Sequence, residues 1–327
     1  MPAHRFQSVE ALRTIAATGV ALYHFLLFSD GTTALFPGFE GGQTFFDLLR
    51  TSVLAFFTLT AVVIPVHFEQ ADYTLHNYPR FVLKRLLRVH IPFIAALLLI
   101  VFTQQVFRLS QEQGIAIDSF RAFANVTLTA EFFHVEWYNT IFWTLAIEMQ
   151  FYLVIGLCFP LIKNYGIYGI AGLFLLGELL HFLWTDSRFF WHYTPYFTMG
   201  FLLWLYITGR LSPVVILLSA FAGSALVYYF HDTSAWLVFL LTPLLLLLLK
   251  NTPRFLSFAG RYTYSFYLVH GLAGGNFLYF SRGWGGESWI MILRVVLAFV
   301  VAFAASWLFF RVVEKFSMKL THRIKYK

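Results

Sequence analysis

The stretch S-V-E-A-L-R-T-I-A-A-T-G-V-A-L-Y-H-F-L-L-F, residues 8–28, is long and apolar enough to form a helix that crosses a membrane. Such a helix needs about 20 predominantly apolar residues. This one also carries Arg13 and His24. Ionisable side chains at membrane depth are costly, which makes both candidates for a function. Their spacing is close to three helical turns, so we expect them on one face, about 16 Å apart.

The composition extends this membrane prediction to the whole chain. Hydrophobic residues make up 59% of the sequence and charged residues only 12%, whereas about a quarter of a soluble protein is charged. We expect an all-α polytopic membrane protein, with one transmembrane domain over residues 1–327 and no separate soluble domain. A β-barrel is not favoured, because alternation does not dominate the apolar stretches. Ten spans are expected, near residues 8–28, 44–66, 88–107, 140–162, 166–184, 192–208, 211–230, 234–250, 257–280 and 289–312.

The placement of lysine and arginine predicts the orientation, because these residues collect in cytoplasmic loops. With the N-terminus in the cytoplasm most of them fall on the inner side, and ten spans then place the C-terminus there too. The net charge of +7 is explained by this topology, so no nucleic-acid partner is expected. The single cysteine, Cys158, excludes a disulfide framework and a cysteine-based metal site. No metal is expected, and the sequence carries no signal for an oligomeric state.

Residues 108–139 form the longest segment that is not apolar, and they are expected on the outer side. A loop of this length inside a compact domain is usually ordered or functional. Three roles are open for it: a lid, a docking surface for an external substrate, or a structural cap.

Two acidic residues are candidate partners of the ionisable pair in the first span. Glu10 precedes Arg13 by three residues, a spacing at which the two can pair on one helix face. His24 has no acidic neighbour at helical spacing, so its partner must come from another helix. Glu148, within F-W-T-L-A-I-E-M-Q-F-Y (residues 142–152), is expected about 12 Å below the outer start of its span. It could orient His24 as a general base, or it could simply hydrogen-bond neighbouring helices.

The segment Y-P-R-F-V-L-K-R-L-L-R-V-H, residues 78–90, gathers cations on one side of a helix. Arg85 and Arg88 are three residues apart, where like charges repel. A phosphate-bearing ligand would offset this repulsion, and the planar guanidinium suits phosphate. The alternative is contact with anionic lipid together with a topology signal.

A third polar group follows in G-R-Y-T-Y-S-F-Y-L-V-H, residues 260–270. Tyr264, Tyr267 and His270 recur at intervals of three, which brings them toward roughly one side of a helix. Together with Trp143 they are expected to line a polar substrate cavity, although each tyrosine could have only a packing role.

These motifs, taken in order, resemble the membrane-bound acyltransferase family 3. They are Arg13 and His24 with ten residues between them, R-L-L-R at 85–88, residues 142–152, and T-Y-S-F-Y-L-V-H at 263–270. The resemblance covers essentially the whole chain and ends with R-V-V-E-K at 311–315. Two departures are visible: Glu10 stands where the family more often has aspartate, and Lys315-Phe316 replaces a basic residue followed by proline.

The resemblance implies transfer of an acyl group, typically acetyl, from acetyl-CoA in the cytoplasm to a hydroxyl of a cell-surface carbohydrate. The protein would then be a multi-pass protein of the bacterial inner membrane. Arg85, Arg88 and Arg13 would hold the nucleotide phosphates, and His24, oriented by Glu148, would activate the acceptor or carry the acyl group itself. A proton-coupled transporter or flippase of a sugar or lipid-linked substrate is the alternative, because intramembrane His, Glu and Arg also form proton relays. A purely structural scaffold would leave these buried polar groups unexplained.

Overall fold

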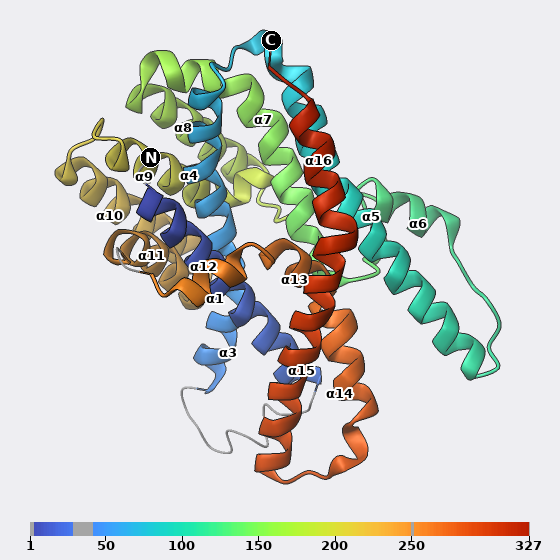
Figure 1. Cartoon of the computed structure of the whole chain (residues 1–327). Coiled ribbons are helices and arrows are strands. Elements are labelled where there is room, and N and C mark those ends of the chain that lie inside the picture. The colour runs from blue at the N-terminus through green and yellow to red at the C-terminus, as the bar shows by residue number, and fades with distance from the viewer. Residues whose placement is uncertain (1–2, 29–41, 250–251, 327) are drawn as a thin grey trace.

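The computed structural model describes residues 3–28, 42–249 and 252–326, and this part of the chain is helical without any strand. Figure 1 shows the helices gathered in one bundle. The start of α1 and the end of α16 both lie in its upper half. The α-helices are α1 (Ala3–Phe28), α3 (Gly42–Thr51), α4 (Leu54–Gln70), α5 (Tyr78–Ser110), α6 (Ser119–Val126), α7 (Trp143–Tyr165), α8 (Ile167–Leu183), α9 (Thr194–Ile207), α10 (Pro213–Phe230), α11 (Thr233–Leu248), α12 (Arg254–Gly260), α13 (Thr263–His270), α14 (Asn276–Phe280), α15 (Ser288–Phe309) and α16 (Lys315–Arg323). Short 3-10 turns are η1 (Leu75–Asn77), η2 (Thr140–Phe142), η3 (Phe190–Tyr193) and η5 (Arg282–Trp284), and two π-helical turns are η4 (Gly271–Gly275) and η6 (Phe310–Glu314).

Six helical segments among the described residues are long and apolar enough to cross a membrane. The apolar helices α8 and α11 are shorter, with 17 and 16 residues. A 17-residue helix rises only about 26 Å, short of a hydrocarbon core of about 30 Å. The expected span at 257–280 is divided among α12, α13, η4 and α14. The multi-pass, all-helical class is therefore confirmed, whereas the count of ten spans and the orientation of the termini stay predictions. The six segments are Phe6–Phe28, Gly42–Gln70, Leu75–Ser110, Thr140–Tyr165, Pro213–Phe230 and Ser288–Arg323.

The centre of the bundle is formed by α4 and α9, which pack against each other and bury most of their side chains. Gly200 of α9 permits the close approach, since a Cβ at this position would lie 2.3 Å from the carbonyl oxygen of Thr58. Small residues at contacts let helices in a membrane approach closely, because van der Waals packing drives their association there. Helix α7 joins this centre through the stacked rings of Phe151 and Phe197, whose centroids are 4.0 Å apart.

Several helices are interrupted inside the bundle. Helices α3 and α4 are separated at Ser52 and Val53, and the Ser52 hydroxyl donates to the carbonyl oxygens of Leu49 and Ala16. The π-helical turn η4 directly follows His270, and η6 ends at Glu314. Irregular backbone at membrane depth is tolerated where it is buried or lines a cavity, and π-turns are frequent at functional sites. These interruptions point to the interior of the bundle as the functional region.

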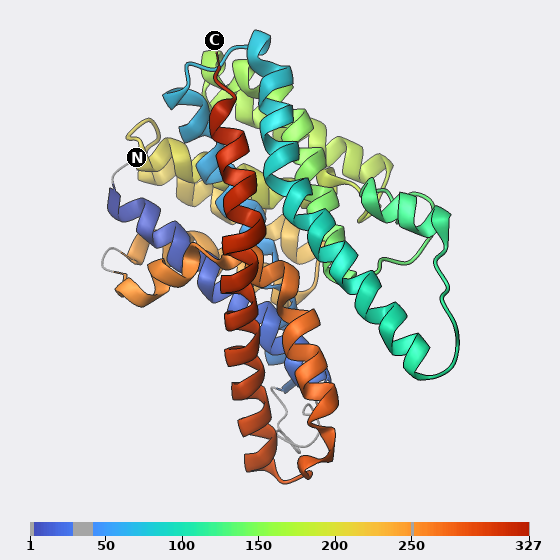
Figure 2. The ribbon, with the colours of Figure 1, turned by 45° about the vertical axis from the view of Figure 1, so that its right-hand side comes forward.

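The segment 108–139 is ordered. It contains the end of α5 and the whole of α6, and Figure 2 shows this part projecting to one side of the bundle. The fully buried side chain of Asn125 donates to the carbonyl oxygens of Arg121 and Glu136 and accepts from the Tyr138 amide. These bonds fold the segment onto itself, as a cap would require. Neither cavity described below is lined by residues 108–139, and the choice between a lid and a cap stays a prediction.

Candidate active site

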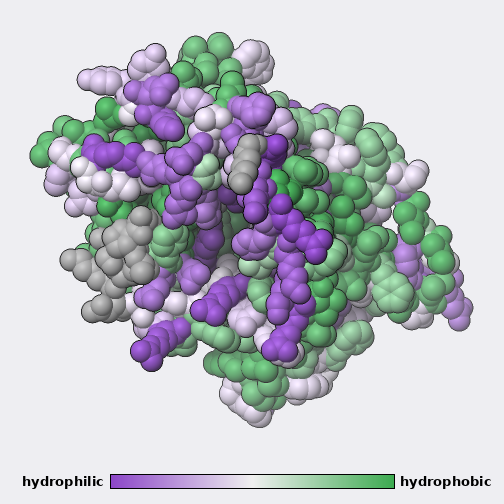
Figure 3. Space-filling model, turned by 45° about the horizontal axis from the view of Figure 1, so that its top comes forward, coloured by the Kyte–Doolittle hydropathy of each residue, from purple (hydrophilic) through white to green (hydrophobic). Residues whose placement is uncertain are grey.

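Two cavities among the described residues are lined by ionisable side chains, and they differ in charge. The first, of about 190 Å³, is called the arginine cavity here and is lined by charged groups from α1, α5, α7, α12–α13 and η6. Four guanidinium groups face two carboxylates in it, so its lining carries an excess of positive charge. Figure 3 shows hydrophilic side chains gathered around a hollow on one face of the molecule, between hydrophobic flanks. The charged lining residues of the arginine cavity are Arg13, Arg85, Arg88, Arg261, Glu148 and Glu314.

Arg88 is held by a carboxylate that the sequence motifs did not assign to it. Its Nη2 donates to Glu314 Oε1 at 2.8 Å, and Glu314, which is completely buried, also accepts a hydrogen bond from the Ser265 hydroxyl. The Arg88 Nη1 atom is buried and has no partner among the described residues. Arg88 therefore lines the arginine cavity with much of its charge already neutralised, and its binding of phosphate stays a prediction.

Arg13 and Arg85 are the less compensated cations of this cavity. Within the described part of the chain Arg13 makes no hydrogen bond or ion pair. The Arg85 guanidinium lies 5.1 Å from the ring centroid of Tyr152 and 5.5 Å from that of Phe81, a cation–π arrangement, and 3.5 Å from His67 Nδ1. Unpaired guanidinium groups facing a cavity are suited to bind phosphate by charge-assisted hydrogen bonds.

Glu148 lines the arginine cavity, and the predicted pair with His24 is not formed. Its Oε1 accepts hydrogen bonds from the Tyr152 hydroxyl, one turn further along α7, and from Thr60 Oγ1 of α4 at 3.2 Å. The reason is depth: Thr144, at the start of α7, lines both cavities, and Glu148 lies one turn deeper, past the point where they meet. Glu148 is thus placed near Arg13 and Arg85 and away from the imidazole.

Glu10 also differs from its expected arrangement. No ion pair within 4.0 Å joins it to Arg13 in the residues that the structure describes. Glu10 instead packs against Gly260, where an added Cβ would lie 2.7 Å from the Glu10 Cβ and 2.7 Å from its carbonyl oxygen. The close contact places α1 against α12 and leaves the Arg13 side chain to the cavity.

The second cavity, of about 320 Å³, is called the histidine cavity here because His24 lines it. His24 Nδ1 lies 3.1 Å from His270 Nε2, and His270 is 1% exposed. His270 Nδ1 lies 2.7 Å from the carbonyl oxygen of Tyr267 and 3.2 Å from that of Phe266. A ring nitrogen beside carbonyl oxygens must carry a proton, so the neutral His270 presents its unprotonated Nε2 to His24.

This chain of hydrogen bonds assigns a tautomer to His24. Its Nδ1–H donates to His270 Nε2, so the lone pair of the neutral ring is on Nε2. A histidine whose Nδ1–H is held by a fixed acceptor can use Nε2 as a general base or nucleophile. His270, predicted as a cavity residue, is therefore the partner of His24, a role that helical spacing along one segment could not reveal.

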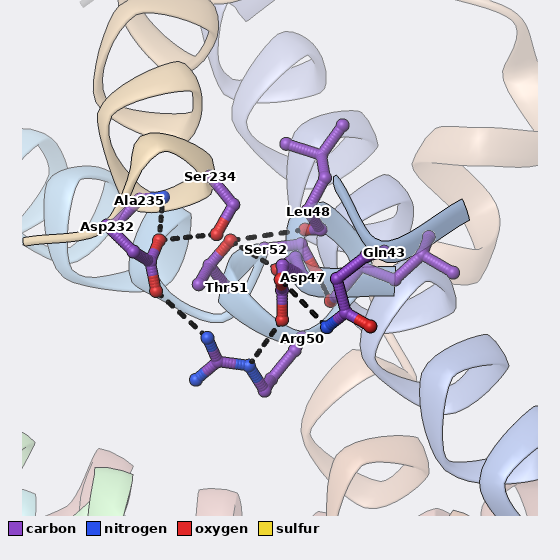
Figure 4. A network of polar contacts seen from close by, with 10 residues as sticks. Gln43, Asp47, Leu48, Arg50, Thr51, Ser52, Asp232, Ser234 and Ala235 are labelled. Carbon is purple, nitrogen blue, oxygen red and sulfur yellow. Dashed lines mark hydrogen bonds and ion pairs between the residues drawn. The ribbon is translucent and has the colours of Figure 1, made fainter. Parts of the chain in front are cut away.

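An ion pair at the edge of the histidine cavity was missed by the sequence analysis. Arg50 Nη2 of α3 donates to Asp232 Oδ2 at 2.9 Å (Figure 4). Both residues line the histidine cavity. Burial opposes ionisation of Asp232, but hydrogen bonds from Ser234 Oγ, the Ala235 amide and Arg50 hold the pKa of Asp232 below its usual value. The carboxylate is thus charged at neutral pH. The only sequence signal was Arg50 itself, a cation within an expected span.

The aromatic residues predicted to line a substrate cavity are divided between the two cavities. Trp143 faces the histidine cavity, with its ring 5.6 Å from that of Tyr193. Tyr264 faces the arginine cavity, and its hydroxyl donates to the carbonyl oxygen of Val89 at 2.8 Å. Tyr267 lines both. These three aromatic residues therefore line two neighbouring cavities, whereas His270 lines neither of them.

Replacing Glu314 by alanine should destabilise the protein, because the substitution removes the counter-ion of Arg88 inside the bundle. Breaking a buried ion pair costs about 3–5 kcal/mol, and we expect the lower end of this range because the Arg88 side chain is 32% exposed. The melting temperature of the purified protein in detergent measures the effect. Glu136→Ala is the matched control: Glu136 pairs with Arg121 at 3.7 Å but is 89% exposed, and such pairs contribute little. Equal melting temperatures for the Glu314 and Glu136 variants would contradict a stabilising role of the Arg88–Glu314 pair.

Fold and site together define an integral membrane protein whose ionisable side chains face two internal cavities. A family model described as an acyltransferase domain matches residues 6–311. The chain belongs to this family, the membrane-bound acyltransferase family 3. The comparisons with curated proteins and with solved structures gave no match. The family resemblance drawn from the four motifs is thus confirmed.

Proposed function

We propose that the protein transfers an acyl group, most simply acetyl, from cytoplasmic acyl-CoA to a hydroxyl of a carbohydrate on the outer face of the bacterial inner membrane. The observation that carries this proposal is the pair of cavities. One is lined by four arginines, the other holds His24, whose Nε2 has no hydrogen-bond partner among the described residues, and three lining residues are common to both. A donor whose phosphates bind in the first can present its thioester toward the second.

The charges support CoA as the donor. Arg13 and Arg85 have no ion pair with a carboxylate among the described residues, and a CoA nucleotide would supply phosphates that offset the excess positive charge of this cavity. The spacing of Arg13 and His24 on α1, about 16 Å along the axis, then suits a donor with a long flexible arm. The pantetheine arm has this character.

The histidine cavity supports a carbohydrate acceptor. Aromatic rings of Trp143, Tyr23 and Tyr193 and the charged pair Arg50–Asp232 line it. Such a mixture of apolar faces and a few fixed polar groups is suited to orient a ligand rich in hydroxyls.

In the proposed reaction His24 Nε2 accepts the proton of the acceptor hydroxyl while the hydroxyl oxygen bonds to the thioester carbonyl carbon. The carbon–sulfur bond then breaks, and the leaving thiolate takes the proton from His24, so that an ester and free CoA result. His270 holds the protonated ring by accepting from Nδ1–H. An acyl-histidine intermediate would use the same Nε2 atom as nucleophile.

The reaction is tested by the mass of surface glycan from cells with and without the protein. A gain of one acyl group on a repeating unit is expected only when the protein is present. Identical glycan masses, together with protein-dependent flux of a sugar or lipid-linked sugar in proteoliposomes, would replace this proposal with transport.

Alanine in place of Arg13 or Arg85 is expected to weaken binding of CoA to the purified protein. A hydrogen bond to a charged group contributes about 1.5–3 kcal/mol, so each variant should raise the Kd about tenfold to a hundredfold. Calorimetric titration with CoA measures this change. Arg50→Ala provides the control, because Arg50 is equally cationic but lines the other cavity. An unchanged Kd in both test variants would contradict phosphate binding and would assign to these arginines a role in lipid contact and topology.

A further inference from the structure

The two cavities share three lining residues, Val53, Thr144 and Tyr267. Each comes from a different part of the bundle: Val53 from the interruption between α3 and α4, Thr144 from the first turn of α7, and Tyr267 from α13. All three are buried, with exposures of 7%, 6% and 7%. They stand between the arginines on one side and His24 on the other.

Hydrogen bonds and packing hold these three side chains in place. The hydroxyls of Thr144 and Tyr267 are 2.7 Å apart, and both lie 2.9 Å from the carbonyl oxygen of Ile141, to which they can donate. The ring of Phe56, one turn beyond Val53, lies 6.0 Å from that of Tyr267. Side chains fixed in this way form a boundary of defined width, because close-packed interiors yield little to an inserted group.

We propose that Val53, Thr144 and Tyr267 enclose the passage through which the acyl group reaches His24, and that their size limits the length of acyl chain that the protein transfers. This inference rests on the proposed function and specifies its donor. The acyl end of the donor enters the passage first, because the phosphates stay in the arginine cavity. Every carbon of the acyl chain must therefore pass these residues before the carbonyl carbon reaches the acceptor oxygen. The bonds formed and broken stay those of the proposed reaction.

The size of the neighbouring space has the same consequence. The histidine cavity, at about 320 Å³, must hold the transferred acyl group together with the acceptor hydroxyl and its sugar ring. A short acyl group leaves room for the sugar, whereas a long chain would compete with it. The passage and the cavity beyond it therefore both favour acetyl over longer donors.

Two substitutions should widen the passage without removing its hydrogen bonds. Val53→Ala deletes two methyl groups, and Thr144→Ser deletes one methyl group but keeps the hydroxyl that contacts Tyr267. Val53→Leu should narrow it. The measured quantity is the release of free CoA from acetyl-, propionyl- and butyryl-CoA, with glycan extracted from the producing cells as acceptor. Since one methylene in a tight pocket changes kcat/KM by about tenfold or more, both widened variants should raise the ratio of butyryl to acetyl transfer by about tenfold, and Val53→Leu should lower acetyl transfer.

Val62→Ala is the matched control, because Val62 belongs to helix α4, which directly follows Val53, is completely buried and lines neither cavity. It should leave the donor ratio at the wild-type value. Titration with CoA should still show saturable binding in every variant, because the arginines of the arginine cavity are retained, and this binding shows that each variant is folded.

The outcomes separate this inference from the proposed function. If wild type and the widened variants release CoA with the same ratio of butyryl to acetyl transfer, the proposed passage is wrong, whereas acyl transfer as the function is retained. If wild type releases no CoA from any of the three donors and glycan masses do not change, both are wrong.

Discussion

Alanine at position 24 is expected to abolish acylation of the surface glycan while the protein is still made and inserted in the membrane. His24 lines the histidine cavity, its Nδ1 is bound to His270, and its Nε2, which has no partner in the described ranges, can take a proton. Loss of a general base alone lowers rates by about 10²–10⁴-fold, and loss of an acyl-carrying nucleophile would lower them further. Mass spectrometry of the glycan, with the amount of protein in the membrane measured in parallel, gives the result.

The control for this variant is His322→Ala, an equivalent deletion at an exposed position of α16. It should leave acylation at the wild-type level. The His24 variant should still bind CoA, because the arginines proposed to hold its phosphates, Arg13 and Arg85, line the arginine cavity. Normal acylation in the His24 variant would refute its assignment, whatever the behaviour of the rest of the site.

The second large effect is expected at His270, which acts through His24 and is therefore a positioning residue. Phenylalanine at position 270 removes the acceptor for His24 Nδ1–H, so that the ring can rotate or carry its proton on Nε2. We expect kcat to fall by about 10²-fold or more, the order of effect of a misplaced base, with little change in the KM for acyl-CoA. Initial rates of CoA release over a range of acyl-CoA concentrations separate the two parameters.

Glutamine at position 270 distinguishes orientation from packing. Its amide oxygen can accept from His24 Nδ1–H, whereas phenylalanine fills the space but accepts nothing. A kcat for the glutamine variant well above that of the phenylalanine variant is expected. Equal losses in both would indicate that His270 contributes shape alone, and the tautomer assigned to His24 would have to be abandoned.

The amino-acid sequence by itself determined the class of the protein and much of one helix. Long apolar stretches without alternation cross a membrane as helices, since unpaired backbone groups are too costly in lipid and a β-barrel needs alternating strands. Helical periodicity then placed Arg13 and His24 on one continuous helix, α1. The four motifs also identified the family, and all but Glu10 and His270 of the predicted site residues line one of the two cavities.

Only the tertiary structure decided which of these residues meet. His24 contacts His270, 246 positions away, and Arg88 contacts Glu314, 226 positions away. Glu148 was expected beside His24 because depth along two helices was estimated from their uncertain ends, and an error of one turn moves a side chain by about 5 Å. The structure places Glu148 with Thr60 and Tyr152 instead.

The same physical reason explains the residues that were missed. Arg50 pairs with Asp232, and Val53 lies beside Thr144 and Tyr267, only because separate helices cross at these points. Periodicity along a helix determines which face a side chain occupies, but the rotation and depth of one helix against another are set by packing between distant segments. The sequence therefore determined which ionisable side chains α1 presents. The packing of the bundle decided which residues contact them and which residues lie between the two cavities.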